Sequence, residues 1–189
     1  SGDIRTIVLV CTVALMGGLL VLMFRPYVAN RFAAYGHVWE YFDTSGYQQT
    51  RTMIYSASGG LFGVGLGNGK LRDIFAATED LVFGVVCEEF GMIMAGAILL
   101  SYIALLVYSI RHSKYARSSF YAICACAAAS LILFQAALNV FGVNDILPLT
   151  GVTLPFISRG GSSIISCWML LAFIKAVDRS TYRYGGVRQ

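Results

Sequence analysis

Long apolar runs dominate the pattern of hydrophobic and polar positions along the chain. Residues 7–24 contain no charged side chain, and neither do residues 92–110 or residues 118–141. About 20 mostly apolar residues span the hydrocarbon core of a bilayer as a helix. The pattern therefore predicts membrane-spanning helices at about residues 4–24, 81–110 and 118–141.

Two further features modify this pattern. The apolar character of the second run extends back to residue 81 and is broken by Glu88 and Glu89. The resulting length of residues 81–110 predicts a helix that tilts or projects beyond the membrane. Residues 162–177 form a shorter apolar run with Lys175 near its end, where a long lysine side chain reaches the interface. We therefore expect an all-α integral membrane protein with about four transmembrane helices in a single membrane domain, residues 1–189.

Basic residues in short loops predict the orientation of such helices, because they are retained on the cytoplasmic side. The segment 111–117 holds three Lys or Arg residues and no acid, and the tail 178–189 holds three arginines and one acid. Four crossings place both segments on one side. We therefore predict a cytoplasmic loop at 111–117 and a cytoplasmic C-terminus, with residues 25–80 and the loop 142–161 outside.

The outer stretches are rich in turn-forming residues. Gly59–Lys70 reads GGLFGVGLGNGK but is no phosphate-binding loop, because Val64 and Leu71 stand where glycine and Ser or Thr are needed. It predicts a flexible or closely packed turn. Tyr47–Ser58, just before it, predicts a short amphipathic helix, for which the membrane surface is a candidate location. Residues 148–163 predict a re-entrant-like loop that is buried in protein or lines a cavity.

Composition supports the membrane class and excludes others. The chain is 57% hydrophobic and 13% charged, whereas soluble domains average about 45–50% apolar and about 25% charged residues. A scattered net charge of +4 does not favour nucleic acid as a partner. The five cysteines all fall in apolar runs, which predicts small buried residues rather than disulfides or metal ligands.

Three carboxylates stand where ionisable groups are costly. Asp80, Glu88 and Glu89 lie at the mouth and in the outer part of the second run, and such groups are functional candidates. Asp80 and Glu88 fall on neighbouring faces of a helix, whereas Glu89 points away from Asp80. The alternative for Asp80 is that it caps the helix N-terminus.

Other polar residues mark the third run and the start of the fourth. Gln135 and Asn139 share one face of a helix and either bond neighbouring helices or line a polar cavity. Arg159 precedes two glycines and Ser162 and Ser163, one of which we expect to be the N-cap. A helix N-terminus beside an arginine is suited to a phosphate, and the alternative is a turn that permits close helix packing.

Four blocks, in order, resemble the SEDS family (shape, elongation, division and sporulation), which includes RodA, FtsW and SpoVE. The blocks read SGYQQT, GGLFGVGLGNGK, EDLVFGVVCEEFG and LPLTGVTLPFISRGGSS. They cover essentially the whole chain, yet the resemblance is to only the last four of about ten spans in that family.

The resemblance implies a glycosyltransferase that polymerises lipid II into peptidoglycan in the bacterial plasma membrane. Asp80 aligns with the catalytic carboxylate of the family and would act as general base. A divalent cation such as magnesium is a candidate cofactor at the lipid pyrophosphate. The expected partners are lipid II, the growing glycan strand, membrane lipid and a class B penicillin-binding transpeptidase. The candidates for substrate contact are Arg159, Ser162, Ser163, Gln135, Asn139, Glu88, Arg51 and Lys70.

This sequence also departs from the family pattern. Arg159 stands where the family usually has tyrosine, and Glu79 adds a second carboxylate beside Asp80. Two other functions stay open beside the enzyme. One is a transporter that moves lipid II across the membrane, and the other is an inactive membrane scaffold that binds the transpeptidase.

Overall fold

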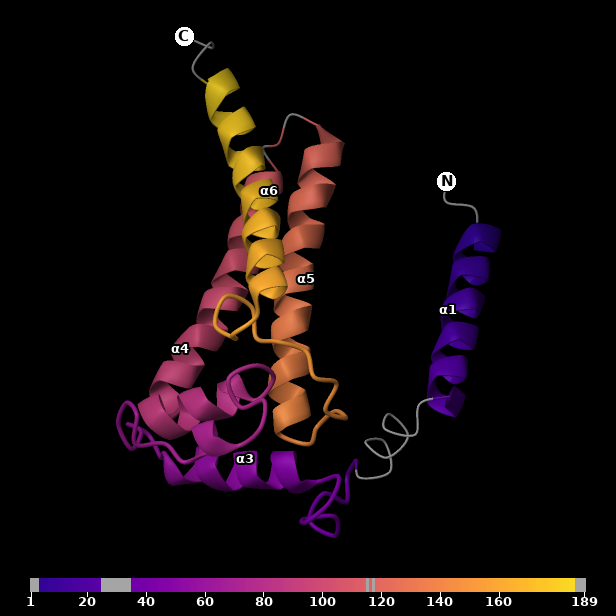
Figure 1. Cartoon of the computed structure of the whole chain (residues 1–189). Coiled ribbons are helices and arrows are strands. Elements are labelled where there is room, and N and C mark those ends of the chain that lie inside the picture. Colours follow the sequence, from indigo (N-terminus) through magenta and orange to yellow (C-terminus); the bar gives the residue numbers. More distant parts are fainter. Residues whose placement is uncertain (1–3, 25–34, 115, 117, 186–189) are drawn as a thin grey trace. The chain divides into compact units, whose positions relative to one another are not determined.

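Helices make up the ordered framework of the chain. The computed structural model describes residues 4–24, 35–114, 116 and 118–185, and within them the regular structure is helical, without strands (Figure 1). This confirms the predicted all-α class. The helices are α1 (Ile4–Phe24), α3 (Tyr47–Ser58), the short 3-10 helix η1 (Leu71–Asp73), α4 (Val82–Ser113), α5 (Ser119–Val143) and α6 (Gly161–Gly185).

Within the described residues, α4 and α5 are long and apolar enough to cross a membrane. Shorter apolar stretches, Ile4–Leu20 and Gly161–Ala176, lie in α1 and α6. These four helices overlap the four predicted spans, and their crossing of the membrane stays a prediction.

Two units, residues 1–47 and 48–189, divide the chain. In the first unit every side chain of residues 4–20 on α1 is exposed. An apolar helix with this exposure suits a surface that faces lipid or other helices. Residues 25–34 lie outside the described residues, so the expectations for that part of the outer segment are not addressed.

In the second unit α5 packs against both α4 and α6 (Figure 1). Small residues make this packing close, since Ala128, Ala129 and Ala136 of α5 are all buried in the main core with Ile132. Small side chains allow helix backbones to approach each other where no water drives association. α3 lies crosswise at one end of these helices, and the helix predicted at Tyr47–Ser58 is confirmed.

A break at Gly91 divides α4. Its backbone has φ 82° and ψ 172°, a conformation that side-chain-bearing residues rarely adopt. Residues 80–89 before the break are all buried, whereas Met92 and Ile93 after it are exposed. The predicted helix 81–110 is therefore correct in extent but wrong in continuity. Its first part packs against α3 and residues 59–71, and its projection beyond the membrane stays a prediction.

The glycine-rich stretch 59–69 pairs with the backbone at this break. The N–H groups of Val64 and Gly65 donate to the carbonyls of Glu88 (2.9 Å) and Glu89 (3.0 Å), and the N–H of Met92 donates to the Gly60 carbonyl (3.0 Å). These hydrogen bonds satisfy the backbone carbonyl and N–H groups that lose their helical partners where α4 is interrupted.

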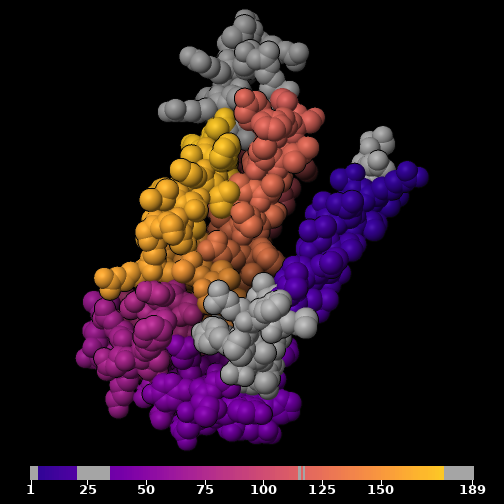
Figure 2. Space-filling model, turned by 45° about the vertical axis from the view of Figure 1, so that its right-hand side comes forward, coloured from indigo at the N-terminus to yellow at the C-terminus, as the bar shows by residue number. Residues whose placement is uncertain are grey.

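Glycine is needed in this stretch because the two backbones approach closely. A Cβ at Gly59 would collide with the Cys87 carbonyl, and one at Gly63 with the Glu89 carbonyl. Of the two readings of the glycine-rich stretch, the closely packed turn is the one observed. Figure 2 shows residues of α3 and the segment after it, in purple and magenta, gathered at one end of the helices.

We predict that Gly91→Ala destabilises the protein. The substitution places a side chain at positive φ and against the Leu61 carbonyl, and such strain costs about 1–3 kcal/mol. Thermal unfolding of the purified protein in detergent should show a lower Tm. The matched control is Gly96→Ala in the regular part of α4, where a Cβ meets open space and alanine favours the helix by about 1 kcal/mol. An unchanged Tm for Gly91→Ala would contradict the need for this break.

Candidate functional site

Asp80 lies immediately before the start of α4, and it is buried with 8% of its surface exposed. Leu81 occupies the N-cap position and makes no side-chain cap bond. Asp80 is therefore not the N-cap residue itself, although its charge lies beside the helix N-terminus, where a negative charge is favoured. Burial of a carboxylate is costly unless it is paired or hydrogen-bonded.

Asn139 of α5 links the Asp80 segment to the loop before α6. Its amide nitrogen donates to the Asp80 carbonyl (2.8 Å) and to the Val152 carbonyl (2.6 Å), and the residue is 2% exposed. Because a carbonyl can only accept a hydrogen bond, the side-chain atom that faces both carbonyls must be the NH2 group of Asn139, which fixes the orientation of its amide. Its Oδ1 atom is buried without a hydrogen-bond partner among the described residues, so it can accept a bond from a ligand or water.

Gln135 binds the same loop one turn away from Asn139. Its amide nitrogen donates to the Thr153 carbonyl (3.0 Å) and the Thr153 hydroxyl (3.2 Å). The Thr153 hydroxyl in turn bonds Ser163 of α6, with 2.7 Å between the oxygens. Gln135, Asn139 and Ser163, three of the predicted site residues, are thus brought together around residues 152–153.

The loop before α6 turns back along the helices (Figure 1, orange). The Tyr102 hydroxyl donates to the Pro155 carbonyl at 2.6 Å, and Leu154 and Pro155 are fully buried. Tyr102 lies eleven residues beyond Gly91, about 16 Å along α4. The loop therefore extends well beyond the Gly91 break along α4, and its re-entrant course in a membrane stays a prediction.

The start of α6 differs from the prediction in one respect. The Gly160 carbonyl accepts the first helical bond, from Ile164 (2.9 Å), so Gly160 occupies the N-cap position. The prediction of a serine N-cap is wrong, because Ser162 and Ser163 lie inside the first turn. Glycine can take this place because it is tolerated as an N-cap.

Arg159 is tied to the Asp80 segment through its backbone. Its N–H donates to the Thr78 carbonyl at 2.8 Å, and its side chain is exposed. Ser162 is exposed as well. The first turn of α6, with its open N–H groups, therefore lies next to the short segment that carries Asp80.

Glu88 lies in a different environment from Asp80. Its two carboxylate oxygens accept bonds from the backbone N–H groups of Lys70 (2.8 Å) and Leu71 (2.9 Å), and the side chain is 2% exposed. The carboxylate therefore anchors the start of η1. With both oxygens engaged in this way, we assign Glu88 no direct contact with substrate.

The remaining two candidates lie on the outer segment. Arg51 is half-buried on α3, and the Lys70 side chain is exposed beside η1. α3 is attached by Gln48, which donates to the Phe75 carbonyl (3.1 Å), and by Gln49, which donates to the Gly142 carbonyl (2.8 Å).

Sequence reasoning missed several residues that build the site. Tyr102 and Thr153 bind or form the loop before α6, and Arg72 pairs with the candidate Glu89 at 3.6 Å between a guanidinium nitrogen and Oε1. The Arg72 side chain is half exposed, so this pair adds little stability. A tyrosine in an apolar run and a threonine in a turn-rich loop carry no signal that separates them from ordinary residues of such segments.

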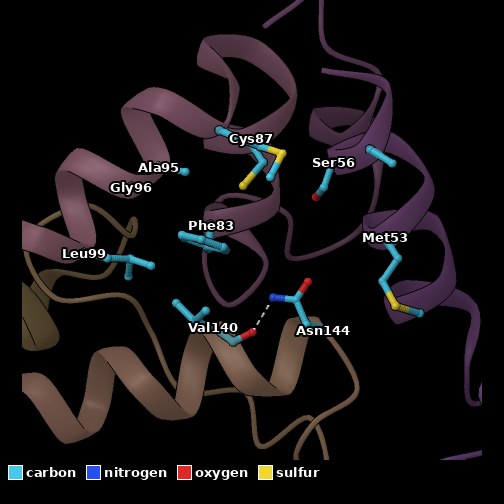
Figure 3. Close-up of a pocket in the computed structure, with 11 residues that line it drawn as sticks. Met53, Ser56, Phe83, Cys87, Ala95, Gly96, Leu99, Val140 and Asn144 are labelled. Atoms are coloured by element: carbon cyan, nitrogen blue, oxygen red, sulfur yellow. Dashed lines mark hydrogen bonds between the residues drawn. The ribbon is translucent and has the colours of Figure 1, made fainter. Parts of the chain in front are cut away.

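A pocket of about 590 Å³ lies between α3, α4 and α5 (Figure 3). Phe83, Cys87 and Leu99 of α4 face Met53 of α3 and Val140 of α5. Such a mostly apolar lining suits hydrocarbon more than sugar.

No group of three or more His, Cys, Asp or Glu residues that could hold a metal ion occurs in the described part of the chain. Asp80 is the buried carboxylate next to Asn139 and the loop before α6. A single carboxylate fits a magnesium ion only together with substrate phosphates and water.

Comparison with known proteins agrees with these observations. A family model described as "Cell cycle protein", for FtsW, RodA and SpoVE, matches residues 1–183. The peptidoglycan glycosyltransferase RodA of Mycobacterium leprae is 37% identical over 138 residues, which cover 73% of this chain and 30% of the relative.

Two further relatives match more of the chain. The probable peptidoglycan glycosyltransferase FtsW of Buchnera aphidicola is 33% identical over 92% of this chain and 45% of its own length. The stage V sporulation protein E of Bacillus subtilis is 32% identical over 88% of this chain and 46% of its own. The chain spans less than half the length of these relatives, and with a family match over residues 1–183 it belongs to the FtsW, RodA and SpoVE family of membrane proteins.

Proposed function

We propose that this chain forms the C-terminal half of a cell-wall glycosyltransferase that polymerises lipid II into peptidoglycan, with Asp80 as general base. Two of the relatives above carry the name peptidoglycan glycosyltransferase. The observation that carries the proposal is the buried Asp80, held through its own carbonyl by Asn139 next to the re-entrant loop. The burial of an ionisable group at a membrane surface needs a functional reason.

The proposed reaction is a glycosyl transfer in which one carboxylate, Asp80, acts as the base. A sugar hydroxyl of one lipid-linked unit attacks the anomeric carbon of the growing strand, and a new glycosidic C–O bond forms. The bond from that carbon to the lipid pyrophosphate breaks, and the leaving group departs with the electron pair. Asp80 takes the hydroxyl proton, and a carboxylate in this role contributes about 10²–10⁴-fold.

The pyrophosphate needs a positive environment as its charge develops. The start of α6 supplies open N–H groups, with the exposed Arg159 and Ser162 beside them. Arg51 and Lys70 on the outer segment are further candidates. A divalent cation, if bound, would supply Lewis-acid charge neutralisation there, with Asp80 as a protein ligand.

Burial and hydrogen bonding divide the remaining candidates by role. Asn139 and Gln135 hold the loop through their amide nitrogens, so we assign them to shaping the site, with Asn139 Oδ1 facing substrate or water. The apolar pocket between α3, α4 and α5 is suited to the lipid part of the substrate.

The proposed setting is a multi-pass protein of the bacterial plasma membrane with a cytoplasmic C-terminus, next to a class B penicillin-binding transpeptidase. The charge distribution of segments 111–117 and 178–189 supports this orientation. Transport of lipid II is the second candidate function, because polar contacts such as Tyr102 to Pro155 lie far along the helices. An inactive scaffold is the third.

We predict that Asp80→Asn abolishes lipid II polymerisation, because the amide cannot take a proton. The test uses proteoliposomes that contain the whole protein, including the half that its relatives possess. Polymer yield should fall by about 10²–10⁴-fold, while a matched variant of an exposed carboxylate, Asp73→Asn, keeps its activity. Unchanged yield in Asp80→Asn would refute the role of this carboxylate. Lipid II flipping without any polymer in the unmodified protein would favour the transporter.

We predict that Asn139→Asp disrupts the site. The carboxylate cannot donate, so the carbonyls of Asp80 and Val152 lose their partner, and each such loss costs about 1–3 kcal/mol. Both the Tm and the polymer yield should fall. The control is Asn68→Asp, because the exposed Asn68 amide donates to the nearby Val64 carbonyl (3.3 Å) and is not part of the proposed site. Wild-type stability and yield in Asn139→Asp would contradict the proposed link.

We predict that Arg159→Gln lowers kcat/KM for lipid II roughly tenfold, which corresponds to about 1.4 kcal/mol of transition-state stabilisation. The loss should shrink at high salt, because an exposed charge is screened. Arg111→Gln, at the other end of the helices, serves as the charge-matched control. Equal kcat/KM for Arg159→Gln and unmodified protein would remove Arg159 from the pyrophosphate site.

A further inference from the structure

The glycine-rich stretch 59–69 presents two large apolar side chains at its surface. Leu61 is 59% exposed and Phe62 is 82% exposed, and the stretch carries no charged residue. We call these two residues the apolar tip. Neighbouring apolar side chains that an ordered loop leaves exposed mark a contact with a membrane or with another protein.

Backbone hydrogen bonds fix the apolar tip beside the point where α4 becomes exposed. The N–H of Met92 donates to the Gly60 carbonyl (3.0 Å), and the N–H of Ile93 donates to the Leu61 carbonyl (3.4 Å). Met92 and Ile93 are themselves exposed, and they begin the uncharged run 92–110. The apolar tip therefore adjoins the first exposed apolar turn of α4.

The backbone around the apolar tip is suited to surroundings that are poor in water. The N–H groups of Gly63, Val64 and Gly65 all donate to backbone carbonyls. The carbonyls of Gly60 and Leu61 accept the two bonds from α4. Irregular backbone near hydrocarbon needs such internal partners, because lipid chains supply none.

The kind of side chain favours lipid over another helix as the neighbour. Helix contacts in membranes are enriched in small residues, as the buried Ala128 and Ala129 of α5 illustrate. The apolar tip and the adjoining turn of α4 present Leu, Phe, Met and Ile instead. Leu and Phe side chains are typical of elements that bury one face between headgroups and acyl chains.

We propose that the apolar tip inserts among the lipid acyl chains of the outer leaflet, next to Met92 and Ile93. Because the glycine-rich stretch is bonded to both sides of the Gly91 break, this insertion holds the break at the membrane surface. The inference uses the predicted crossing of the membrane by α4. It does not depend on the chemistry proposed for Asp80.

The test is photocrosslinking from the apolar tip. Phe62 is replaced by p-benzoylphenylalanine in the whole protein, which is reconstituted in vesicles of phosphatidylethanolamine and phosphatidylglycerol. Mass spectrometry should find lipid adducts about tenfold more often than with the same probe at Asp73, an exposed charged position of η1 that we expect to stay in water. Crosslinks from position 62 only to protein, or equal lipid adducts at both positions, would overturn the proposal. So would lipid adducts at the exposed Leu100 of α4 with none at position 62, a result that leaves the crossing of α4 intact.

A pair of variants tests whether the apolar character of the tip causes the insertion. With the photoprobe at Leu61, Phe62→Asp should lower the yield of lipid adducts about threefold or more, because a charge is costly among acyl chains. Phe62→Leu, the apolar control, should keep the yield. Since the Phe62 side chain is largely exposed, both variants should fold, which an unchanged circular-dichroism spectrum verifies. An equal yield in Phe62→Asp and Phe62→Leu would refute the insertion.

Discussion

The hydrocarbon core of a membrane contains no water, so each backbone N–H and C=O group at that depth needs a partner in the protein. A regular helix supplies those partners itself, but this chain interrupts its helices at Gly91 and in the loop before α6. At Gly91 the glycine-rich stretch donates to the carbonyls of Glu88 and Glu89. In the loop, side chains of Asn139, Gln135 and Tyr102 reach backbone carbonyls. At both places the partners come from other segments of the second unit.

The same requirement explains where polar side chains are placed. Glu88 is expensive to bury as a charge, yet both its oxygens accept backbone N–H groups that begin η1. Asn139 is equally buried, and its two donated bonds join the Asp80 segment to the re-entrant loop. A buried acidic or amide side chain, which suggests a catalytic or binding role, can therefore act instead as a hydrogen-bond partner for backbone groups. Asp80 stands apart because it is buried one residue before the N-cap of α4, beside Asn139 and the loop before α6.

This arrangement separates two chemical environments along the helices. Around Asp80, the start of α6 and the outer segment provide open N–H groups, hydroxyls and an exposed arginine, which suits a charged and sugar-bearing substrate. Farther along α4 and α6 lies a mostly apolar groove, whose lining includes Leu105, Tyr108, Trp168 and Lys175. The re-entrant loop connects them, since its Thr153 bonds the start of α6 while its Phe156 meets Trp168 farther along the same helix.

The amino-acid sequence by itself determined the helical class, the approximate extent of α1, α4, α5 and α6, the turn-rich stretches, and Asp80 as the residue to test. Those features are local, because about 20 consecutive apolar residues or a cluster of Gly and Pro act within their own segment. The break in α4, the partners of Glu88 and the role of Asn139 were decided only by tertiary structure. Asn139 and Asp80 are 59 positions apart, and Glu88 and Lys70 are 18 apart. No local pattern encodes which backbone groups will be left unsatisfied and which distant side chain will reach them, because that depends on how the segments pack.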